Sequence, residues 1–258
     1  MITQIRFALI FAAVALAGCS DTSEPSKAGT FSGPTLQVGG GEARSVVTLD
    51  RDGNPVSMAV AISDGAVENP PTPPAGMMWA EHTLALPAEA AGTVFDHLTL
   101  DWNPHGHPPI GIFNLPHFDI HFYTISVEKR NTMLPSDPAF AEKGHRLPAA
   151  EFIPQGYISP DPETIPRMGR HWIDPSSPEF NGEPFTATFI YGSYDGEMIF
   201  LEPMVTRAFL QTRPNFVRPL KLPARYAVPG HYPSSYRVTY DASANEHRIT
   251  LGDFVRRD

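Results

Sequence analysis

The sequence predicts a mainly β fold, an antiparallel barrel or sandwich with long irregular loops and few short helices. Short runs in which apolar and polar residues alternate are separated by turn-forming residues, which is the pattern of half-buried strands. The 258 residues include 28 prolines, and proline breaks a helix interior, so a helical bundle is excluded. With 41% hydrophobic residues the chain can bury a core, so general disorder is excluded as well.

The amino-terminal segment has the features of an export signal. Residues 1–18 hold one basic residue and then an apolar run over 7–17, which is too short to cross roughly 30 Å of hydrocarbon. Leu16-Ala-Gly-Cys19 resembles a bacterial lipobox, which implies cleavage before Cys19 and lipid attachment to its thiol. Ser20 at the next position favours the outer membrane, facing the periplasm. We therefore expect an extracytoplasmic lipoprotein anchored through Cys19; an ordinary secretory signal with a chance cysteine is the alternative.

Composition limits both the domain organisation and the partners. Residues 19–43 are rich in Ser, Gly, Thr and Pro and predict a flexible tether, and residues 44–258 predict a single β-rich domain. The net charge of −9 and the absence of a basic run argue against nucleic acid as a partner, because phosphate contacts need clustered cations. Because Cys19 is the only cysteine, a metal would be held by imidazole and carboxylate.

The predicted elements follow the alternation along the chain. The expected strands are 45–49, 56–62, 81–86, 95–102, 116–127, 185–191, 197–202, 236–240 and 247–251. Turn-rich connections at 50–55, 192–196 and 241–246 predict three hairpins. One helical turn is expected at 87–92. The proline-rich stretch 135–178 predicts a long loop over the domain, with a short helix near 138–143, and loops of that length are usually functional.

The strand expected at 116–127 carries the chemistry. Its side chains alternate, so four polar ones project from one face and three apolar ones from the other. The polar set is His117, Asp119, His121 and Tyr123, and the apolar set is Phe118, Ile120 and Phe122. An apolar face of this kind is packed, and three ionisable groups on the opposite face are costly to bury unless they are paired or bind something.

Neighbouring residues complete a candidate metal site. His105 and His107 are two positions apart, and the Pro108-Pro109 and Gly111 breaks allow the chain to turn back toward His117. Such a site suits Zn²⁺, Cu²⁺, Ni²⁺, Mn²⁺ or Fe²⁺. The candidate ligands are His105, His107, His117, His121, His171 and Glu202, and the residues expected to orient them are Asp119, Asp101 and Tyr123. A structural polar network and metal-free acid–base catalysis are the alternatives, and we interpret His82, His97, His145, His231 and His247 as structural.

Several blocks of the sequence carry a resemblance to a known family. These are Phe95-Asp-His-Leu-Thr-Leu-Asp-Trp-Asn-Pro-His-Gly-His-Pro-Pro109, Pro116-His-Phe-Asp-Ile-His-Phe-Tyr123, Met168-Gly-Arg-His-Trp172, Thr188-Phe-Ile-Tyr-Gly-Ser-Tyr-Asp-Gly196 and Phe200-Leu-Glu-Pro-Met204. Over residues 80–210 the chain resembles a family of uncharacterised bacterial extracytoplasmic proteins, typified by a thermophile protein under sigma-factor/anti-sigma control. The resemblance implies a β-rich fold and admits a homo-oligomer. It brings no catalytic assignment and no known small-molecule ligand.

Three functional hypotheses follow. The first is a lipid-anchored envelope protein with a histidine-rich divalent metal site, in which His107, His117 and His121 are ligands and others complete the set. The second is a metal-dependent hydrolase or hydratase, with an open coordination position and the 135–178 loop as a lid. The third is a non-catalytic envelope binding or assembly module with a structural histidine network. Convergence of the imidazoles at one point separates the first two from the third.

Overall fold

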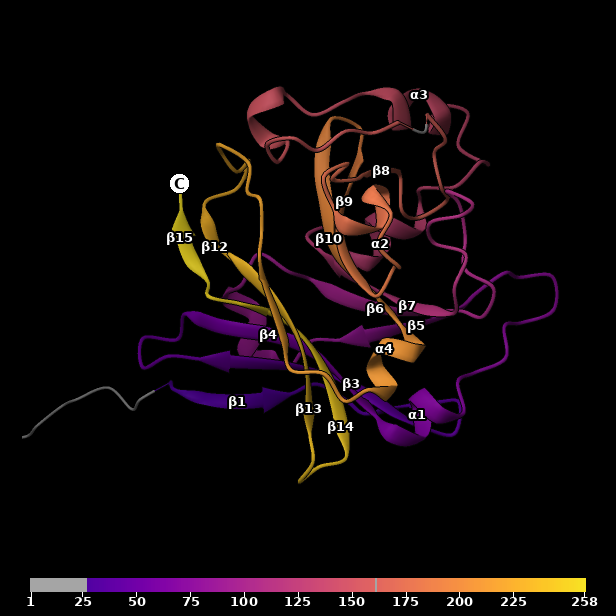
Figure 1. Cartoon of the computed structure of the whole chain (residues 1–258). Helices are drawn as coiled ribbons and strands as arrows, with labels where there is room; N and C mark the ends of the chain where they lie inside the picture. The colour runs from indigo at the N-terminus through magenta and orange to yellow at the C-terminus, as the bar shows by residue number, and fades with distance from the viewer. Residues whose placement is uncertain (1–26, 161) are drawn as a thin grey trace, which may run out of the picture.

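Two antiparallel sheets pack face to face in a computed structural model of the chain, which describes residues 27–160 and 162–258 (Figure 1). In the described part of the chain neither sheet closes on itself, so the fold is a sandwich and the barrel alternative is excluded. All pairs between the described strands are antiparallel. The mainly β prediction is confirmed.

The first sheet is built around two of the predicted hairpins. Its order is β1-β3-β4-β14-β13-β11, with β2 paired to β3. The strands are β1 (Gly29–Ser32), β2 (Leu36–Val38), β3 (Gly41–Leu49), β4 (Pro55–Ser63), β11 (Phe216–Pro219), β13 (Ser235–Asp241) and β14 (Glu246–Gly252). The β3–β4 turn is closed by the Asp50 carboxylate, which accepts hydrogen bonds from the backbone N–H groups of Asp52 and Asn54, both at 2.9 Å.

The second sheet contains the polar strand singled out above. Its order is β5-β6-β7-β10-β9-β8. The strands are β5 (Ala80–Ala85), β6 (His97–Asn103), β7 (His117–Tyr123), β8 (Arg170–Trp172), β9 (Ala187–Tyr194) and β10 (Glu197–Thr206). Asp195 and Gly196 join β9 to β10 with φ values of 53° and 81°, and a two-residue turn with positive φ at both positions matches the twist of a hairpin. A separate ribbon pairs β12 (Gly230–Tyr232) with β15 (Val255–Arg257).

The helices are short and lie in the connections. They are α1 (Asp64–Glu68), η1 (Ala88–Gly92), α2 (Val127–Asn131), α3 (Phe140–His145), η2 (Ala150–Phe152), η3 (Pro178–Asn181) and α4 (Arg207–Gln211). The predicted turn at 87–92 and the helix near 138–143 correspond to η1 and α3. No helix among the described residues is both long and apolar enough to span a bilayer.

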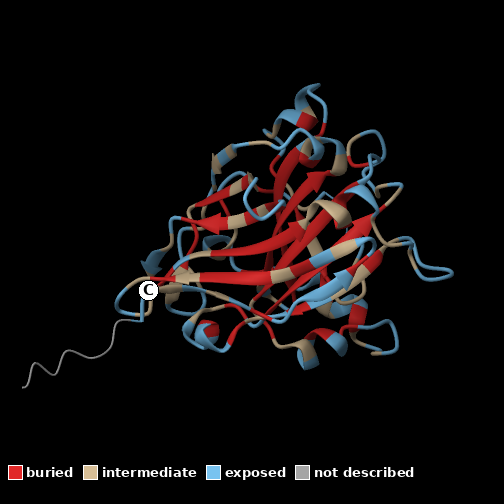
Figure 2. Ribbon diagram, turned by 90° about the horizontal axis from the view of Figure 1, so that it is seen from below, coloured by how far each residue is buried: buried red, intermediate tan, exposed pale blue. Residues whose placement is uncertain are grey.

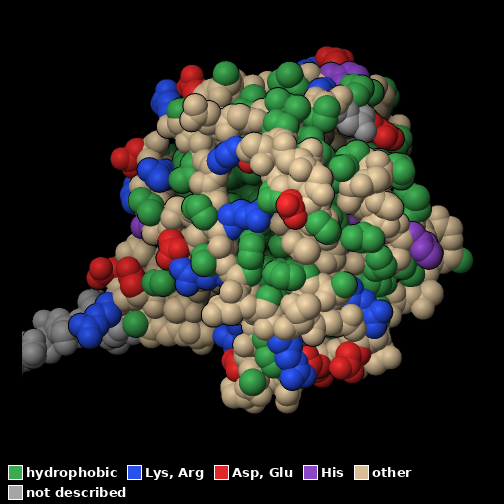
Figure 3. Space-filling view, in the orientation of Figure 1, with side chains coloured by type: hydrophobic (Ala, Val, Ile, Leu, Met, Phe, Trp, Pro, Cys, Tyr) green, Lys and Arg blue, Asp and Glu red, His purple; other side chains and the backbone are tan. Residues whose placement is uncertain are grey.

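The main core lies between the two sheets. Strand residues from both sheets, among them Val47 and Met58 from the first and Leu98 and Phe118 from the second, form one buried apolar cluster. Figure 2 shows the central strands buried along most of their length, whereas the edge strands and the connections are largely exposed. On the face drawn in Figure 3, basic and acidic side chains are interspersed, and Lys or Arg side chains rim a hollow near its middle.

The predicted tether is wrong over residues 29–43. That segment forms β1, β2 and the start of β3, with Val38 and Ala43 fully buried and Phe31 packed against the main core. Its composition suggests flexibility, but the few apolar residues are placed where pairing with β3 buries them, and tertiary packing overrides local propensity. The export signal, Cys19 and the first part of the predicted tether lie outside the described residues.

Candidate metal centre

β7 is buried on both faces, which is unusual for a strand with three ionisable side chains. Phe118, Ile120 and Phe122 belong to the core between the sheets, as the alternation predicts. On the other face His117 and His121 are 0% exposed and Asp119 is 5% exposed. Ionisable groups at this depth are costly unless each has a partner or a ligand.

The long connection between β7 and β9 covers this polar face. Met133, Phe140 and Met168 from the connection pack in one apolar cluster with Tyr123 and Phe200 from the sheet. The Tyr123 hydroxyl also donates a hydrogen bond to the Arg167 carbonyl at 3.2 Å. The long connection predicted over residues 135–178 is therefore found, but it contains the strand β8 as well as the short helices α3 and η2. Its apolar contacts with Tyr123 and Phe200 cover the polar face of β7.

The first group of converging side chains is His107, His117 and Asp119. Nε2 of His107 lies 3.3 Å from Asp119 Oδ2, and Nε2 of His117 lies 3.0 Å from Asp119 Oδ1. Each ring is oriented by its other nitrogen: His107 Nδ1 donates to the Pro108 carbonyl at 2.7 Å and His117 Nδ1 donates to the Leu115 carbonyl at 2.6 Å. A carbonyl can only accept, so both rings carry a proton on Nδ1, and Nε2 is the nitrogen that loses its proton and binds when a metal ion takes the site.

A tight loop after β6 returns His107 to the strand. The His107 backbone N–H donates to the Phe113 carbonyl at 3.0 Å, which folds the segment back on itself. Gly106 allows the two parts of this loop to come close together. Its φ is 65°, and a Cβ at this position would lie only 2.0 Å from the Phe113 carbonyl oxygen. Glycine is required at this point because no side chain fits and the left-handed conformation is strained for other residues.

The second group is His121, His171 and Glu202, one residue from each of β7, β8 and β10. Glu202 Oε2 lies 3.4 Å from His121 Nε2 and 3.8 Å from His171 Nε2. The His121 ring is oriented through its other nitrogen, which lies 3.1 Å from the Thr99 hydroxyl and 3.5 Å from Asp101 Oδ2. Phe200 packs edge-on against His121, with ring centroids 4.7 Å apart.

Three carboxylates share this buried region without a direct ion pair to a lysine or an arginine, although the charges of Arg130 and Arg167 act on Asp101. Among the described residues Asp101, Asp119 and Glu202 form ion pairs with histidines and with no lysine or arginine. Asp101 lies directly opposite Asp119 on the neighbouring strand, where like charges repel. Burial and the neighbouring acids raise the pKa of Asp101 and of Glu202 well above the ordinary range. Burial would also raise the pKa of Asp119, but His117 and His107 outweigh it and hold that pKa below its ordinary value.

Several of the converging atoms have no hydrogen-bond partner among the residues that the structure describes. They are His117 Nε2, Asp119 Oδ1, His121 Nε2, Glu202 Oε2 and both carboxyl oxygens of Asp101. Buried polar side chains are nearly always hydrogen-bonded, so a concentration of exceptions calls for an explanation. Binding of an ion is one of the few physical causes, and these atoms are donors of the kind that a divalent ion binds.

The nitrogen–oxygen distances are those of ligands that share a cation, and the three donor atoms of each group lie within 4.8 Å of one another. Two ligands about 2.0–2.2 Å from one ion at a tetrahedral angle lie about 3.3–3.6 Å apart. The nitrogen–oxygen separations of 3.0–3.8 Å bracket that value. Each group offers two imidazoles and one carboxylate, a set used by catalytic zinc sites and by non-haem iron sites, both of which keep coordination positions open.

Both groups open into one cavity of about 280 Å³. His107 and Asp119 of the first group and His171 and Glu202 of the second line it, together with Asp101. The rest of the wall is mainly apolar and includes Trp79, Phe113, Ile165, Met168, Ile173 and Ile190. A mostly apolar pocket with a few convergent polar groups is the usual form of a small-molecule site.

A family model matches part of the chain. Residues 50–102 match the model described as TTHB210-like, hypothetical protein TTHB210. The match runs from the β3–β4 turn to Trp102 in β6, which includes Asp101 and ends before the histidine-rich segment. It agrees with the resemblance to an uncharacterised family over residues 80–102, and no reaction comes with it. No curated protein and no solved structure gives a significant match.

The structure divides the predicted ligands between two groups and leaves one outside. His107 and His117 meet in the first group, and His121, His171 and Glu202 meet in the second. His105 is exposed and belongs to neither. Asp119, predicted to orient a ligand, is itself placed among the donors, while Asp101 lies behind His121 and Tyr123 stacks against the His121 ring at 5.5 Å. The five histidines interpreted as structural, at 82, 97, 145, 231 and 247, lie outside both groups.

Sequence reasoning missed the residues that support and enclose the donors. Asn103 donates a hydrogen bond to Asp119 Oδ2 at 2.8 Å, and Thr99 contacts His121. Trp79 and Met168 line the cavity. Asn103 and Thr99 share a face of β6 with Asp101, so the alternation already contained this signal; Trp79 and Met168 come from connections, where no periodicity marks them.

Proposed function

We propose that this protein binds divalent metal ions on the polar face of β7, one at each three-residue group. The observation that carries the proposal is the convergence of imidazole nitrogens and carboxylate oxygens in two groups. Four of these atoms, on His117, Asp119, His121 and Glu202, are buried and have no hydrogen-bond partner among the described residues. A bound cation would neutralise carboxylates whose burial costs several kcal/mol each when they are ionised and unpaired. A purely structural network would instead be expected to satisfy these atoms internally.

The donor set favours ions of borderline character. Two imidazoles and a carboxylate suit Zn²⁺, Fe²⁺, Mn²⁺, Ni²⁺ and Cu²⁺, whereas Mg²⁺ and Ca²⁺ prefer oxygen alone. The sequence has one cysteine, Cys19, so the described residues offer no thiolate. Intrinsic affinity alone would favour Cu²⁺ at a site of this kind. The ion that the protein carries therefore depends on which of these metals is available in the cell envelope.

Metal analysis of histidine variants tests this function. The full chain, purified without chelators, is expected to carry two ions per molecule by elemental analysis. His117→Ala and His171→Ala are each expected to remove one ion, from the first and second group respectively. His105→Ala is the matched control, an exposed histidine in the same loop as His107, and it should retain both. Equal metal content in all four proteins would contradict the proposal.

A second candidate function is metal-dependent hydrolysis or hydration. The observation that favours it is the cavity, which gives a small molecule access to His107, Asp119, His171 and Glu202. A metal ion with an open position lowers the pKa of bound water to about 7 and supplies a nucleophile at neutral pH. The apolar wall would take a small substrate with limited polarity.

Activity measurements separate the two functions. Ester and phosphoester hydrolysis and CO₂ hydration, assayed with the metal-loaded chain, should be lost on chelation and restored by one divalent ion. His117→Ala and His171→Ala should lack that activity. Metal-loaded protein that binds two ions but turns over none of these substrate classes would favour metal binding without catalysis.

We also propose that the chain is a lipoprotein of the cell envelope, anchored through Cys19 in the outer membrane. The support is the lipobox-like Leu16-Ala-Gly-Cys19 after an apolar run, which lies outside the described residues. Cys19→Ser should move the protein from the membrane fraction to the soluble periplasmic fraction. A variant that stays in the membrane fraction would contradict the anchor.

A further inference from the structure

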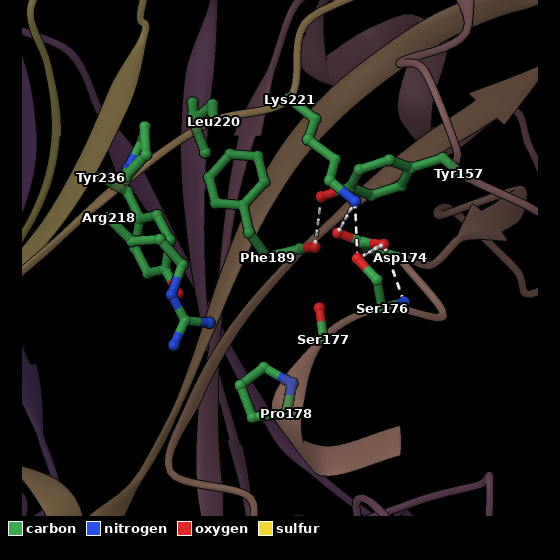
Figure 4. Close-up of a pocket in the computed structure, with 11 residues that line it drawn as sticks. Tyr157, Asp174, Ser176, Ser177, Pro178, Phe189, Arg218, Leu220, Lys221 and Tyr236 are labelled. Atoms are coloured by element: carbon green, nitrogen blue, oxygen red, sulfur yellow. Dashed lines mark hydrogen bonds and ion pairs between the residues drawn. The ribbon is translucent and has the colours of Figure 1, made fainter. Parts of the chain in front are cut away.

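A second cavity lies where the two sheets approach each other, away from the metal centre. It has a volume of about 270 Å³ and shares no lining residue with the cavity beside β7. Arg218 and Tyr236 come from β11 and β13 of the first sheet, and Phe189 comes from β9 of the second. Figure 4 shows Arg218 on one side of this space and Lys221, Asp174 and Ser176 on the other.

Arg218 is a cation without a carboxylate partner. Within residues 27–160 and 162–258 it forms no ion pair; its guanidinium lies over the ring of Phe216, 5.1 Å from the centroid. Glu179 is a nearby buried acid whose charge raises the pKa of Tyr236. Among the described residues, Glu179 forms no ion pair with Arg218 either. A ring face compensates a guanidinium only in part, and the five N–H groups of arginine suit planar anions.

Tyr236 is the second polar group of this cavity. It is 0% exposed, and among the described residues its hydroxyl donates to no acceptor. The Arg218 guanidinium is the cation that acts on the hydroxyl oxygen, which places both groups at the same end of the cavity. Register places it directly opposite Arg218 on the adjacent strand, so both side chains project from the same face. Burial raises the pKa of this phenol, so the hydroxyl stays protonated and can donate a hydrogen bond. A buried donor with nothing to donate to is costly and indicates a missing acceptor.

Lys221 is already neutralised and leaves the positive charge with Arg218. Its ammonium lies 2.7 Å from Asp174 Oδ2 and donates to the Ser176 hydroxyl at 2.7 Å. The backbone of Lys221 is also held in place, because the Tyr191 hydroxyl donates a hydrogen bond to the Lys221 carbonyl at 2.9 Å. The lining therefore holds one unpaired cation, in a chain whose net charge is −9.

We propose that this cavity binds the carboxylate of a small organic acid with an apolar, aromatic-sized body. Arg218 and the Tyr236 hydroxyl hold the carboxylate, and Tyr157, Phe189 and Leu220 contact the body. One unpaired guanidinium and one phenol match a monoanion. A phosphate dianion would need a second free cation, and Lys221 is engaged with Asp174.

Binding of benzoate tests the proposal, with benzamide as a neutral probe of the same shape. Titration calorimetry uses the full chain treated with chelator, because a carboxylate also ligates metal ions. Benzoate should bind once per chain, and benzamide at least about tenfold more weakly, since hydrogen bonds to charged groups are the stronger ones. Equal affinity for the two probes, or tighter binding of inorganic phosphate than of benzoate, would overturn the carboxylate site.

Two variants and a control locate the binding. Arg218→Gln should weaken benzoate binding by about tenfold or more, and Tyr236→Phe, which keeps the ring, by about two- to tenfold. Arg225→Gln is the matched control, because Arg225 is exposed, pairs with Glu151 and does not line the cavity. Unchanged benzoate binding by Tyr236→Phe and by folded Arg218→Gln, checked by melting temperature, would refute the assignment. Should Arg218→Gln fail to fold, Tyr236→Phe decides alone.

Discussion

Asp119 is the side chain on which the first metal group depends. It lies between His107 and His117, and each of its carboxyl oxygens contacts Nε2 of one of these rings. Asn103 donates a hydrogen bond that holds the carboxylate in place. The two rings keep its pKa low, so the carboxylate is available as a negatively charged ligand without first losing a proton. Both the position of the Asp119 carboxylate and its negative charge therefore favour binding of a metal ion.

Replacing Asp119 with asparagine should remove the ligand while keeping its shape. We expect Asp119→Asn to weaken metal binding at the first group by more than about 100-fold, since even residues that only orient ligands contribute about 10–100-fold. Calorimetric titration with Zn²⁺ or Co²⁺ measures the loss. Asp52→Asn, an exposed acid in the β3–β4 turn, is the control and should bind as the unaltered chain does.

Glu202 behaves in the opposite way, and this gives a pH dependence. Burial and the charges of Asp119 and Asp101 raise its pKa in the folded state, so the metal-free fold holds a proton that the unfolded chain releases. Stability should therefore fall as pH rises from the ordinary value of 4.5 toward the raised pKa, since the folded state binds more protons there.

Melting temperatures of chelator-treated protein across this pH window test the expectation. Glu202→Gln keeps the side-chain shape and cannot ionise, so its melting temperature should decline less with pH than that of the unaltered chain. Parallel curves for the two proteins would show that Glu202 does not hold the proton.

The placement of the second group depends on close packing between strands. Phe200 on β10 lies beside Gly192 on β9, and it packs against both His121 and His171, with ring centroids 4.7 and 5.5 Å apart. A Cβ at Gly192 would lie 2.0 Å from the Phe200 ring. The glycine thus makes room for the aromatic ring that positions two of the donors.

Gly192→Ala should damage the second group selectively. Overpacking of this kind costs about 1–3 kcal/mol and shifts the ring, so we expect a lower melting temperature and one metal ion lost per chain. The first group should keep its ion. Gly92→Ala, where a Cβ meets nothing within 4 Å, is the matched control. An alanine variant that still binds two ions would show that Phe200 has no positioning role.

Much of the strand pattern was predictable, because alternation reports which face a residue occupies. The opposite faces of β7 are as predicted: Phe118 and Ile120 point into the core and His117 and His121 point away from it. The division of the donors into two groups was not predictable, because it depends on β8, which lies about 50 residues along the chain from β7. Arg218 and Tyr236 were missed for the same reason, since only the β11–β13 register brings them together.

The molecule as a whole should be stabilised by the ions it binds. Asp101 and Glu202, two buried acids that form no ion pair with lysine or arginine among the described residues, oppose folding of the metal-free chain when they are ionised. A ligand at 100 times its dissociation constant stabilises by about 2.7 kcal/mol, which corresponds to about 5–10 °C in melting temperature for a domain of this size.

Thermal denaturation with and without Zn²⁺, Mn²⁺, Ni²⁺ or Cu²⁺ measures this effect. The double variant Asp119→Asn/Glu202→Gln should show no increase, because each group has lost its anionic ligand. An unaltered chain whose melting temperature responds to none of these ions would contradict the metal centre itself.

The covering of β7 on both sides also has a kinetic consequence. The apolar core closes one side and the long connection closes the other, so the cavity beside Asp119 is the passage that the described residues leave for an ion. Met78, which is 68% exposed, and the Pro108-Pro109 pair belong to its wall. Exchange of a bound ion with solution should then be slow and governed by opening of this entrance, so the protein would retain its metal through brief exposure to a competing chelator.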